Sequence, residues 1–222
     1  RNVEKVTDKR SADLDVLGSH YRNGSKLVER LHSSGARYWP GTSVWEISAA
    51  EEPTLAVGVV RDGRVRMIQA DHIILATGAM ERPTPFPGWT LPGVMTVGAA
   101  QTLLKSSGLV PDGRIAVAGS GPLLYLYVSQ LIKAGKKPQV ILDTRPRASL
   151  QAKLSVLTAL TVDPASMFRG LGWMREVRRE VRVRERVHQL RAGGGEKLSS
   201  ISYESCDRQF TDEVDLLLVH DG

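Results

Sequence analysis

A glycine-rich turn between two apolar segments is the part of this sequence whose residue types and spacing best suit chemistry. Gly119 permits a tight strand-to-helix turn, and Gly121 lets a pyrophosphate approach the backbone. The N–H groups and dipole at a helix N-terminus favour an anion there. Pro122 suits the first helical position, because its missing N–H costs no helix bond at that place. The turn, with Ser120 and Leu123, is therefore predicted to bind the phosphates of a nucleotide.

The third position of the usual glycine pattern holds Leu124. Glycine at this position allows close packing of helix on strand, so leucine is expected to hold the helix slightly away or to tilt it. A pair of glycines is a weak signal by itself. The strand before it, the helix after it and an acid at the right distance favour a nucleotide site over a turn that binds nothing.

That acid is Asp143, at the end of the next apolar segment. A carboxylate at this place accepts hydrogen bonds from the ribose of an adenosine, which favours NAD over NADP. Thr144 follows it directly, and Arg145 and Arg147 lie just beyond. Either arginine could instead serve a 2′-phosphate, and Asp143 could merely cap a turn. The choice between nucleotides therefore stays open at this point.

The glycine turn lies within a predicted strand–helix–strand unit, which is typical of α/β proteins. The strands cover residues 114–119 and 139–143, and the helix between them runs from 122 to about 134. A helix over residues 96–107 precedes the unit. A helical stretch with uncertain bounds between residues 148 and 180 comes after it, and then strands near 181–190, 198–204, 208–213 and 214–219.

The first part of the chain predicts a helix over residues 21–34 and then a β-meander. Asp62-Gly63 is a strong signal for a tight hairpin turn within it. The strands cover residues 43–48, 54–60, 65–70 and, more apolar and buried, 72–77. The order helix, meander, buried strand occurs again towards residue 222, which predicts two related nucleotide-binding lobes. The Pro/Gly-rich segment 78–94 is predicted to connect them.

The net charge of +6 is concentrated between residues 169 and 191. A nucleic-acid-binding patch is one interpretation, but the segment lacks the interleaved aromatic residues that base stacking needs. Glutamates are interspersed, and the spacing is first helical and then alternating. We therefore favour a solvated helix followed by an edge strand.

Cys206 is the single cysteine, which excludes a disulfide framework, a thiolate zinc site and a C-x-x-C redox pair. This fits a reducing cytoplasm. No apolar run approaches the roughly 20 residues of a membrane span. The chain begins at Arg1 and stops after a strand-like run, so both ends are expected to be cut.

Two stretches together, "IILATGAMERPTPFPGWTLPGVMTVGAAQTLL" and "VAGSGPLLYLYVSQLIKAG", resemble the flavoproteins with two dinucleotide-binding lobes. In that superfamily an NAD(P)-type lobe is inserted within an FAD lobe. The resemblance is to the amine- and amino-acid-oxidising branch, which includes opine oxidase A subunits, hydrogen cyanide synthase B subunits, sarcosine oxidase α subunits and dye-linked proline dehydrogenase. Leucine at the third glycine position is typical of this branch.

The resemblance implies an α/β, Rossmann-like, three-layer fold that binds FAD and NAD(P), with a β-meander in each lobe. It implies a partial FAD lobe over residues 1–94 and an inserted nucleotide-binding lobe over residues 95–222. The family's FAD fingerprint would precede residue 1, and its FAD-closing segment would follow residue 222. The residues implied to lie against FAD are Val44, Trp45, Ala76, Thr77 and Gly78.

The function implied is oxidation of a secondary amine or amino acid, with hydride transfer from the substrate to FAD. The chain would hold NAD(P) or another adenine nucleotide in its inserted lobe, would work with a second oxidase subunit, and would be inactive alone. The alternative is a non-catalytic nucleotide-binding module of a multi-subunit oxidase. No residue is predicted to be a catalytic base: Glu81 and Arg82 are interpreted as an ion pair at a hinge, and the histidines are scattered, namely His20, His32, His72, His188 and His220.

Overall fold

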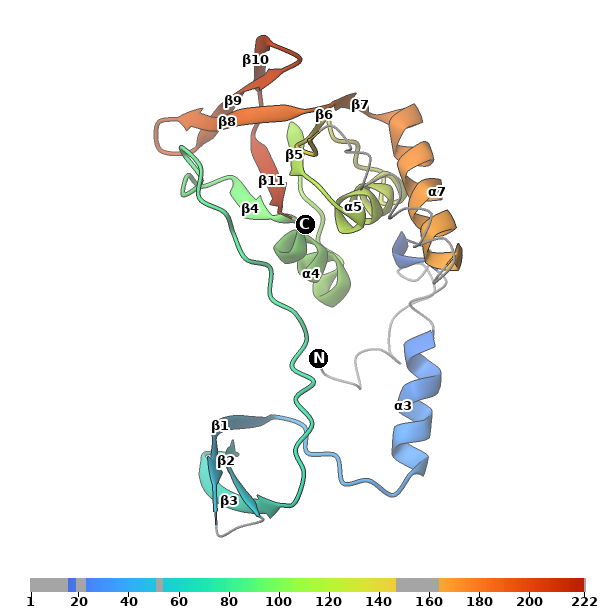
Figure 1. Cartoon of the computed structure of the whole chain (residues 1–222), viewed down its shortest axis with the longest axis vertical. Helices are drawn as coiled ribbons and strands as arrows, with labels where there is room; N and C mark the ends of the chain where they lie inside the picture. The colour runs from blue at the N-terminus through green and yellow to red at the C-terminus, as the bar shows by residue number, and fades with distance from the viewer. Residues whose placement is uncertain (1–15, 19–22, 51–53, 147–163, 222) are drawn as a thin grey trace. The chain divides into compact units, whose positions relative to one another are not determined.

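The computed structural model describes residues 16–18, 23–50, 54–146 and 164–221, which are coloured in Figure 1. They form two compact units. Unit 1 contains the described residues from 23 to 79, and unit 2 contains residues 16–18 together with residues from 80 onward. The chain therefore passes from unit 2 into unit 1 and back again.

Unit 1 consists of helix α3 (Asn23–Ser33) and an antiparallel meander of three strands. The strands are β1 (Thr42–Ala49), β2 (Leu55–Arg61) and β3 (Arg64–Ala70), paired in that order. The hairpin between β2 and β3 turns at Asp62 (φ 52) and Gly63 (φ 70). Both residues have the positive φ that a type I′ turn requires, so the predicted hairpin is confirmed.

The prediction of a buried strand over residues 72–77 is wrong. This segment is extended without ladder pairing, and Ile74 and Leu75 are 91% and 72% exposed. A strand needs a neighbour to take up its backbone N–H and C=O groups. Among the described residues, the meander of unit 1 ends at Ala70 and provides no partner for this apolar run. An apolar sequence therefore does not form a strand unless a neighbouring strand is available to pair with it.

Unit 2 is built on a parallel sheet with the strand order β4-β11-β5-β6-β7. Its strands are β4 (Val94–Thr96), β5 (Ile115–Gly119), β6 (Val140–Asp143), β7 (Arg182–Arg184) and β11 (Leu216–His220). Its helices are α4 (Val97–Ser107), α5 (Pro122–Lys133) and α7 (Pro164–Glu180). The predicted strand–helix–strand unit around the glycine turn is confirmed. The predicted helical stretch is confirmed only as α7, because residues 148–163 lie outside the described residues.

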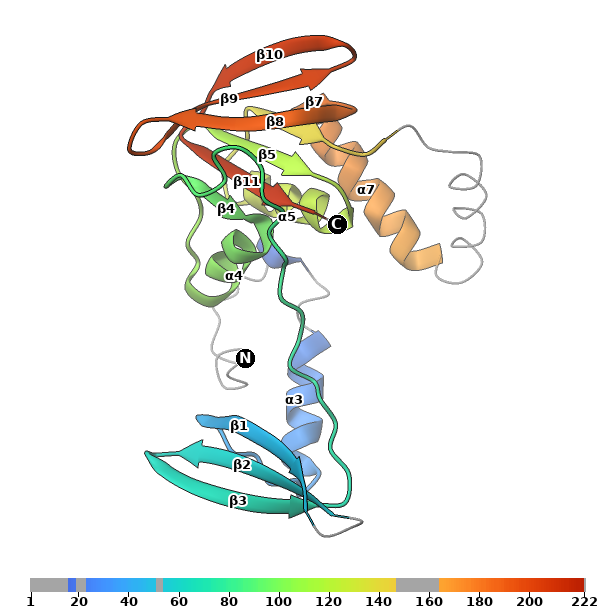
Figure 2. The same cartoon turned by 60° about the vertical axis from the view of Figure 1, so that its left-hand side comes forward.

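A second, antiparallel sheet covers one face of the parallel sheet, while α4 and α5 lie on the other face with α7 beside α5 (Figure 2). Its strands are β8 (Val187–Gly194), β9 (Leu198–Ser205) and β10 (Arg208–Glu213). The two sheets share a buried core that includes Ala116, Leu142, Leu198, Ile201 and Leu217. Unit 2 is thus the expected three-layer α/β fold with a meander.

The arginine-rich stretch after α7 forms two strands, whereas one was predicted over residues 181–190. The chain turns at Arg186, which has φ 55, so β7 joins the edge of the parallel sheet and β8 joins the antiparallel sheet. The charges are paired locally: Arg178 with Glu185 at 2.7 Å and Arg182 with Asp212 at 3.0 Å. The solvated helix and edge strand that the charge pattern favoured are therefore present.

Residues 80–94 belong to unit 2, because β4 pairs with β11 and the segment before it is hydrogen-bonded to β8 through the N–H of Ala192 and the carbonyl of Pro87 at 2.8 Å. The compact units thus divide between Ala79 and Met80. A domain boundary at residue 94 stays a prediction. None of the described helices combines the length and the continuous apolar character that crossing a membrane requires.

Candidate functional site

The glycine turn joins β5 to α5 at the carboxyl edge of the parallel sheet. Gly119 has φ 139, and a Cβ on it would lie 1.8 Å from the carbonyl oxygen of His220, so only glycine fits beside β11. Gly121 has φ 90 and occupies the N-cap of α5 without a side-chain hydrogen bond. Pro122 begins the helix, as predicted, and Leu124 is fully buried behind it. The first N–H groups of α5 therefore keep their capacity to bind an anion.

The strand order changes direction beside this turn. From β5 the chain continues through β6 to β7 on one side, whereas β11 and β4 lie on the other side. In open α/β sheets, ligands bind outside the carboxyl ends of the strands at such a switch point. The residues that end the strands here are Thr96, Gly119 and His220, with Thr144 directly after β6. All four line one cavity of about 410 Å³.

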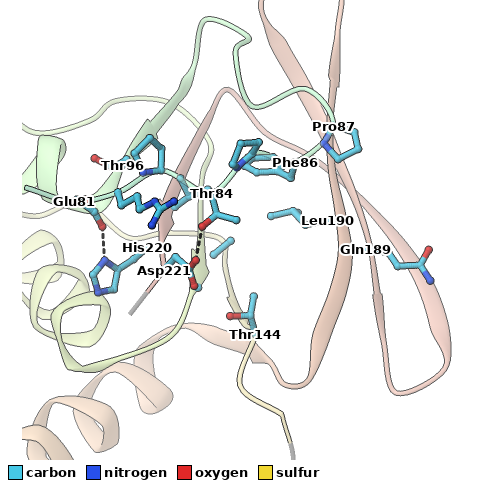
Figure 3. A pocket seen from close by; sticks show the side chains of 16 residues that line it. Glu81, Thr84, Phe86, Pro87, Thr96, Thr144, Gln189, Leu190, His220 and Asp221 are labelled. Atoms are coloured by element: carbon cyan, nitrogen blue, oxygen red, sulfur yellow. Dashed lines mark hydrogen bonds and ion pairs between the residues drawn. The ribbon is translucent and has the colours of Figure 1, made fainter.

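The opposite wall of the cavity is the extended segment 81–87, which crosses the ends of the strands (Figure 3). We call this segment the strap. Thr84 donates a hydrogen bond to the carboxylate of Asp221, just after β11. Phe86 and Leu190 contribute apolar side chains to the far end of the cavity. The Pro-rich connector of the sequence is thus an ordered wall of a ligand-sized space.

Glu81 and His220 form the most enclosed polar pair in this wall. The side chains are 12% and 10% exposed, and Nδ1 of His220 bonds Oε1 of Glu81. The second carboxylate oxygen, Oε2, accepts the N–H of Gly98 at 2.5 Å, in the first turn of α4. The interpretation of Glu81 and Arg82 as an ion pair is wrong, because the carboxylate is occupied by His220 and the helix N-terminus.

Asp143 lies at the end of β6, as predicted, but its carboxylate is already engaged. It accepts hydrogen bonds from the Arg145 N–H at 3.0 Å, from the Arg145 Nε at 2.9 Å and from the Tyr125 hydroxyl at 2.8 Å. Asp143 is 3% exposed. A ribose hydroxyl would therefore have to share this carboxylate, and its role as the ribose acceptor stays a prediction.

The electrostatics of this cluster follow from burial and charge-assisted bonding. Burial alone would raise the pKa of Asp143, but the hydrogen bonds from Arg145 and Tyr125 outweigh it and hold that pKa below its usual range. Burial, together with the bond to Asp143, raises the pKa of Tyr125 to about 12. The guanidinium of Arg145 is 43% exposed and lies 5.7 Å from the ring centre of Tyr125.

The residues predicted to contact FAD lie in unit 1. Val44 and Trp45 are more than half exposed on β1, at a β-bulge between Val44 and Glu46. Ala76, Thr77 and Gly78 lie in the exposed extended segment after the meander. These two groups come from different parts of unit 1, and their contact with FAD stays a prediction.

The sequence pattern identified the glycine turn and Asp143 as candidate site residues, but it did not identify Glu81 and His220. His220 directly follows the predicted strand 214–219, as Asp143 ends the strand 139–143, and a polar side chain at the end of a parallel strand was the available signal. Nothing in the sequence around Glu81 indicated its pairing, because its partner His220 lies 139 residues away. Among the described residues, no group of three His, Cys, Asp or Glu side chains is arranged to hold a metal ion.

Known proteins resemble this chain over most of its length. It is 36% identical over 210 residues to the opine oxidase A subunit of Agrobacterium tumefaciens (strain Ach5), a match that covers 93% of this chain and 42% of the relative. It is 51% identical over 72 residues to hydrogen cyanide synthase subunit HcnB of Pseudomonas aeruginosa, covering 32% of this chain and 16% of that protein. The predicted resemblance is confirmed. The chain is a homologue of these oxidase subunits, and it spans about 42% of the length of the opine oxidase subunit it matches.

Solved structures show the same fold. L-Proline dehydrogenase from P. horikoshii matches with a TM-score of 0.56 at 19% identity, over 90% of this chain and 31% of that one. FAD-bound DfoA, a cadaverine monooxygenase from Erwinia amylovora, matches with a TM-score of 0.59 at 12% identity, over 90% and 56%. The fold is therefore a Rossmann-like α/β fold that these two enzymes also have. No family model matches the chain.

Proposed function

We propose that this chain is part of an FAD-dependent oxidoreductase and that its unit 2 binds NAD(P) or another adenine nucleotide. One observation carries the nucleotide site: a cavity of about 410 Å³ at the switch point of the sheet is lined by Gly119, the first residue of the glycine turn, and the α5 N-terminus that follows this turn has no side-chain cap. The turn supplies N–H donors for the pyrophosphate, and Thr144 and Arg145 follow β6 at the end where the adenosine would lie. Gly119, Ser120, Gly121, Pro122 and Leu123 form the phosphate side.

The reaction proposed for the whole protein is oxidation of a secondary amine or amino acid. Support comes from relatives that are named opine oxidase and sarcosine oxidase subunits. FAD would supply the redox chemistry by accepting a hydride from the substrate. On this chain, Val44, Trp45 and the Ala76-Thr77-Gly78 segment would contact it. Gly78 fits this role because it has φ 84 and no atom within 4 Å of the place of a Cβ, which leaves its backbone open to a flat ring.

A second oxidase subunit is proposed as the partner, since the relatives are named as subunits. The cysteine usage suits a cytoplasmic protein. The alternative function is a non-catalytic adenine-nucleotide module within such an oxidase. The occupied carboxylate of Asp143 supports this alternative, because it weakens the argument for specific NAD recognition and leaves the exposed Arg145 guanidinium to meet a phosphate.

Isothermal titration of the 222-residue chain with NAD, NADP, ADP, ATP and FAD tests the proposal. We expect micromolar binding of at least one of the first four, weakened about tenfold by Asp143→Asn if the carboxylate contacts the ribose or holds Arg145 in place. Asp215→Asn is the matched control: this aspartate also pairs with an arginine, Arg114 at 3.0 Å, but at the opposite edge of the sheet. Preference for NADP or ATP favours the contact through Arg145. Absence of binding by all four would refute the nucleotide site.

A further inference from the structure

The pair formed by Glu81 and His220 lies at the place where the proposed nucleotide would carry its charge. His220 is the last residue of β11 and is the ladder partner of Gly119 in β5. Its carbonyl accepts the N–H of Ser120 at 3.1 Å, so its backbone is in contact with the glycine turn. Its side chain lines the same cavity as Gly119. A titratable ring therefore sits beside the turn proposed to hold the pyrophosphate.

The geometry fixes which ring nitrogen is available. Nδ1 bonds Glu81, as Figure 3 shows, and Nε2 lies on the opposite edge of the ring, directed away from that carboxylate. Glu81 is itself held by the N–H of Gly98, so the carboxylate cannot turn without giving up the first turn of α4. No residue of the described parts of the chain is hydrogen-bonded to Nε2. This nitrogen is thus a fixed polar group with unused hydrogen-bonding capacity, on a residue that lines the cavity.

The protonation state of His220 decides what Nε2 can bind. Because Glu81 takes the Nδ1–H in either state, Nε2 is an acceptor when the ring is neutral and a donor when the ring is a cation. The oxygens of an internal pyrophosphate are acceptors only. They can form a charge-assisted hydrogen bond with the cation but not with the neutral ring.

We propose that Nε2 of the His220 cation donates a hydrogen bond to the pyrophosphate of the bound nucleotide, with Glu81 as the positioning residue. The inference rests on the proposed nucleotide site of unit 2. It gives that site a property of its own: binding takes up a proton whenever His220 is neutral in the free protein. The affinity should therefore depend on pH, because binding and protonation of the ring are linked.

Other charged groups line the same cavity and bear on this pH dependence. Asp221 follows His220 directly, and its carboxylate accepts the Thr84 hydroxyl. Arg82 lies in the strap and lines the cavity as well. From α4 and the glycine turn, the groups near His220 are the backbone N–H of Gly98 and of Ser120. Histidine is thus the cavity residue type that changes charge between about pH 6 and pH 8.

ADP-ribose is the appropriate probe. Its pyrophosphate is esterified on both sides and keeps its charge across this range, whereas the terminal phosphate of ADP titrates near pH ~6. Titrations from about pH 5.5 to pH 8.5 should show the affinity of the unsubstituted chain falling at least about tenfold as the pH rises. In His220→Gln the affinity should be weak and flat with pH. Glu81→Gln keeps an acceptor for Gly98, but its amide NH2 would then face Nδ1 of His220. The neutral ring would carry its proton on Nε2 and could donate as well, so the affinity of this variant should depend less on pH.

His188→Gln is the matched control, because His188 also pairs with a glutamate, Glu204 at 3.1 Å, but outside the cavity. It should reproduce the profile of the unsubstituted chain. Proton uptake on the unsubstituted chain, measured as the dependence of binding heat on buffer ionisation enthalpy, needs no variant to fold. No proton uptake, or a pH slope retained in His220→Gln, would overturn the inference while ADP-ribose still binds. No binding of ADP-ribose at any pH would remove the nucleotide site itself, and the inference with it.

Discussion

At the scale of single residues, the polar side chains of the site are already hydrogen-bonded to other residues of the chain. For Asp143, the sequence predicts the position in the fold but not the hydrogen-bond partners. Its place at the end of β6 follows from the apolar pattern and the distance from the glycine turn. Its engagement by Tyr125 does not, because that contact depends on how the face of α5 packs over the strand. The same holds for Glu81 and His220, which meet only through the path of the strap.

The lowered pKa of Asp143 predicts an acid-labile contribution to the stability of unit 2. A carboxylate with a depressed pKa in the folded state stabilises the fold above its unfolded pKa, about 3.9, and loses this contribution as the pH falls through its folded pKa. The free energy of unfolding in urea should therefore differ between the unsubstituted chain and Asp143→Asn near pH 7. The difference should begin to shrink near about pH 4 and vanish only below the lowered folded pKa of Asp143. The exposed substitution Asp207→Asn should leave this pH dependence unchanged.

Tyr127 is the opposite case, a buried hydroxyl without a hydrogen-bond partner among the described residues. Burial raises its pKa, which reflects the absence of any group that would stabilise the phenolate. Tyr127→Phe removes an unsatisfied polar group and should raise the free energy of unfolding by up to about 1 kcal/mol. Tyr125→Phe in the same helix loses a real bond to Asp143 and should lower it by about 1 kcal/mol. Equal losses in both variants would contradict this account.

At the scale of elements, periodicity and turn residues predicted most helices and strands of the described chain. These signals gave wrong predictions where pairing with a strand distant in the sequence determines whether a segment forms a strand. Residues 72–77 have the composition of a buried strand, but the described meander offers no edge to pair with. The arginine-rich stretch carries no typical turn residue, yet Arg186 has a positive φ between β7 and β8, which lie in different sheets.

The close contact between β5 and β11 predicts that the stability of the fold depends strongly on glycine at position 119. Gly119→Ala would place a methyl group 1.8 Å from the His220 carbonyl oxygen at φ 139, and should cost about 3 kcal/mol or more of unfolding free energy. Gly108→Ala, at the C-cap of α4, has φ 68 but no atom within 4 Å, and should cost only about 1 kcal/mol. Chemical denaturation of both variants checks this. Similar losses would mean that backbone conformation alone, and not the approach of β11, requires glycine at 119.

At the scale of the whole molecule, the units are not single stretches of chain. Residues 16–18 belong to unit 2 although unit 1 separates them from the rest of it in the sequence. Leu17 is 2% exposed, and its carbonyl accepts a hydrogen bond from Gln130 of α5 at 3.2 Å. No periodic signal in so short a segment could have predicted this assignment.

Leu17→Ala should therefore destabilise unit 2 by about 2–3 kcal/mol, as for other buried leucines. The affinity of unit 2 for ADP-ribose at a temperature where the variant is folded should stay within about twofold, because Leu17 does not line the cavity. Leu27→Ala is the control: this leucine is 63% exposed on α3 of unit 1 and should change stability by less than about 0.5 kcal/mol. A loss for Leu17→Ala as small as the control's would contradict the assignment of residues 16–18.

The prolines of the strap limit the hydrogen bonds that this wall of the cavity can donate to a ligand. Pro83, Pro85 and Pro87 have no backbone N–H, so this wall offers carbonyl oxygens and ring carbons but few amide donors. The donors are gathered on the other side, at the glycine turn and the start of α5. The strap wall of the cavity is therefore poor in backbone donors, and its side chains Arg82 and Thr84 supply the polar groups there. We expect the uncharged rings of the proposed nucleotide to pack against these prolines, since the prolines have no N–H to donate to its phosphates.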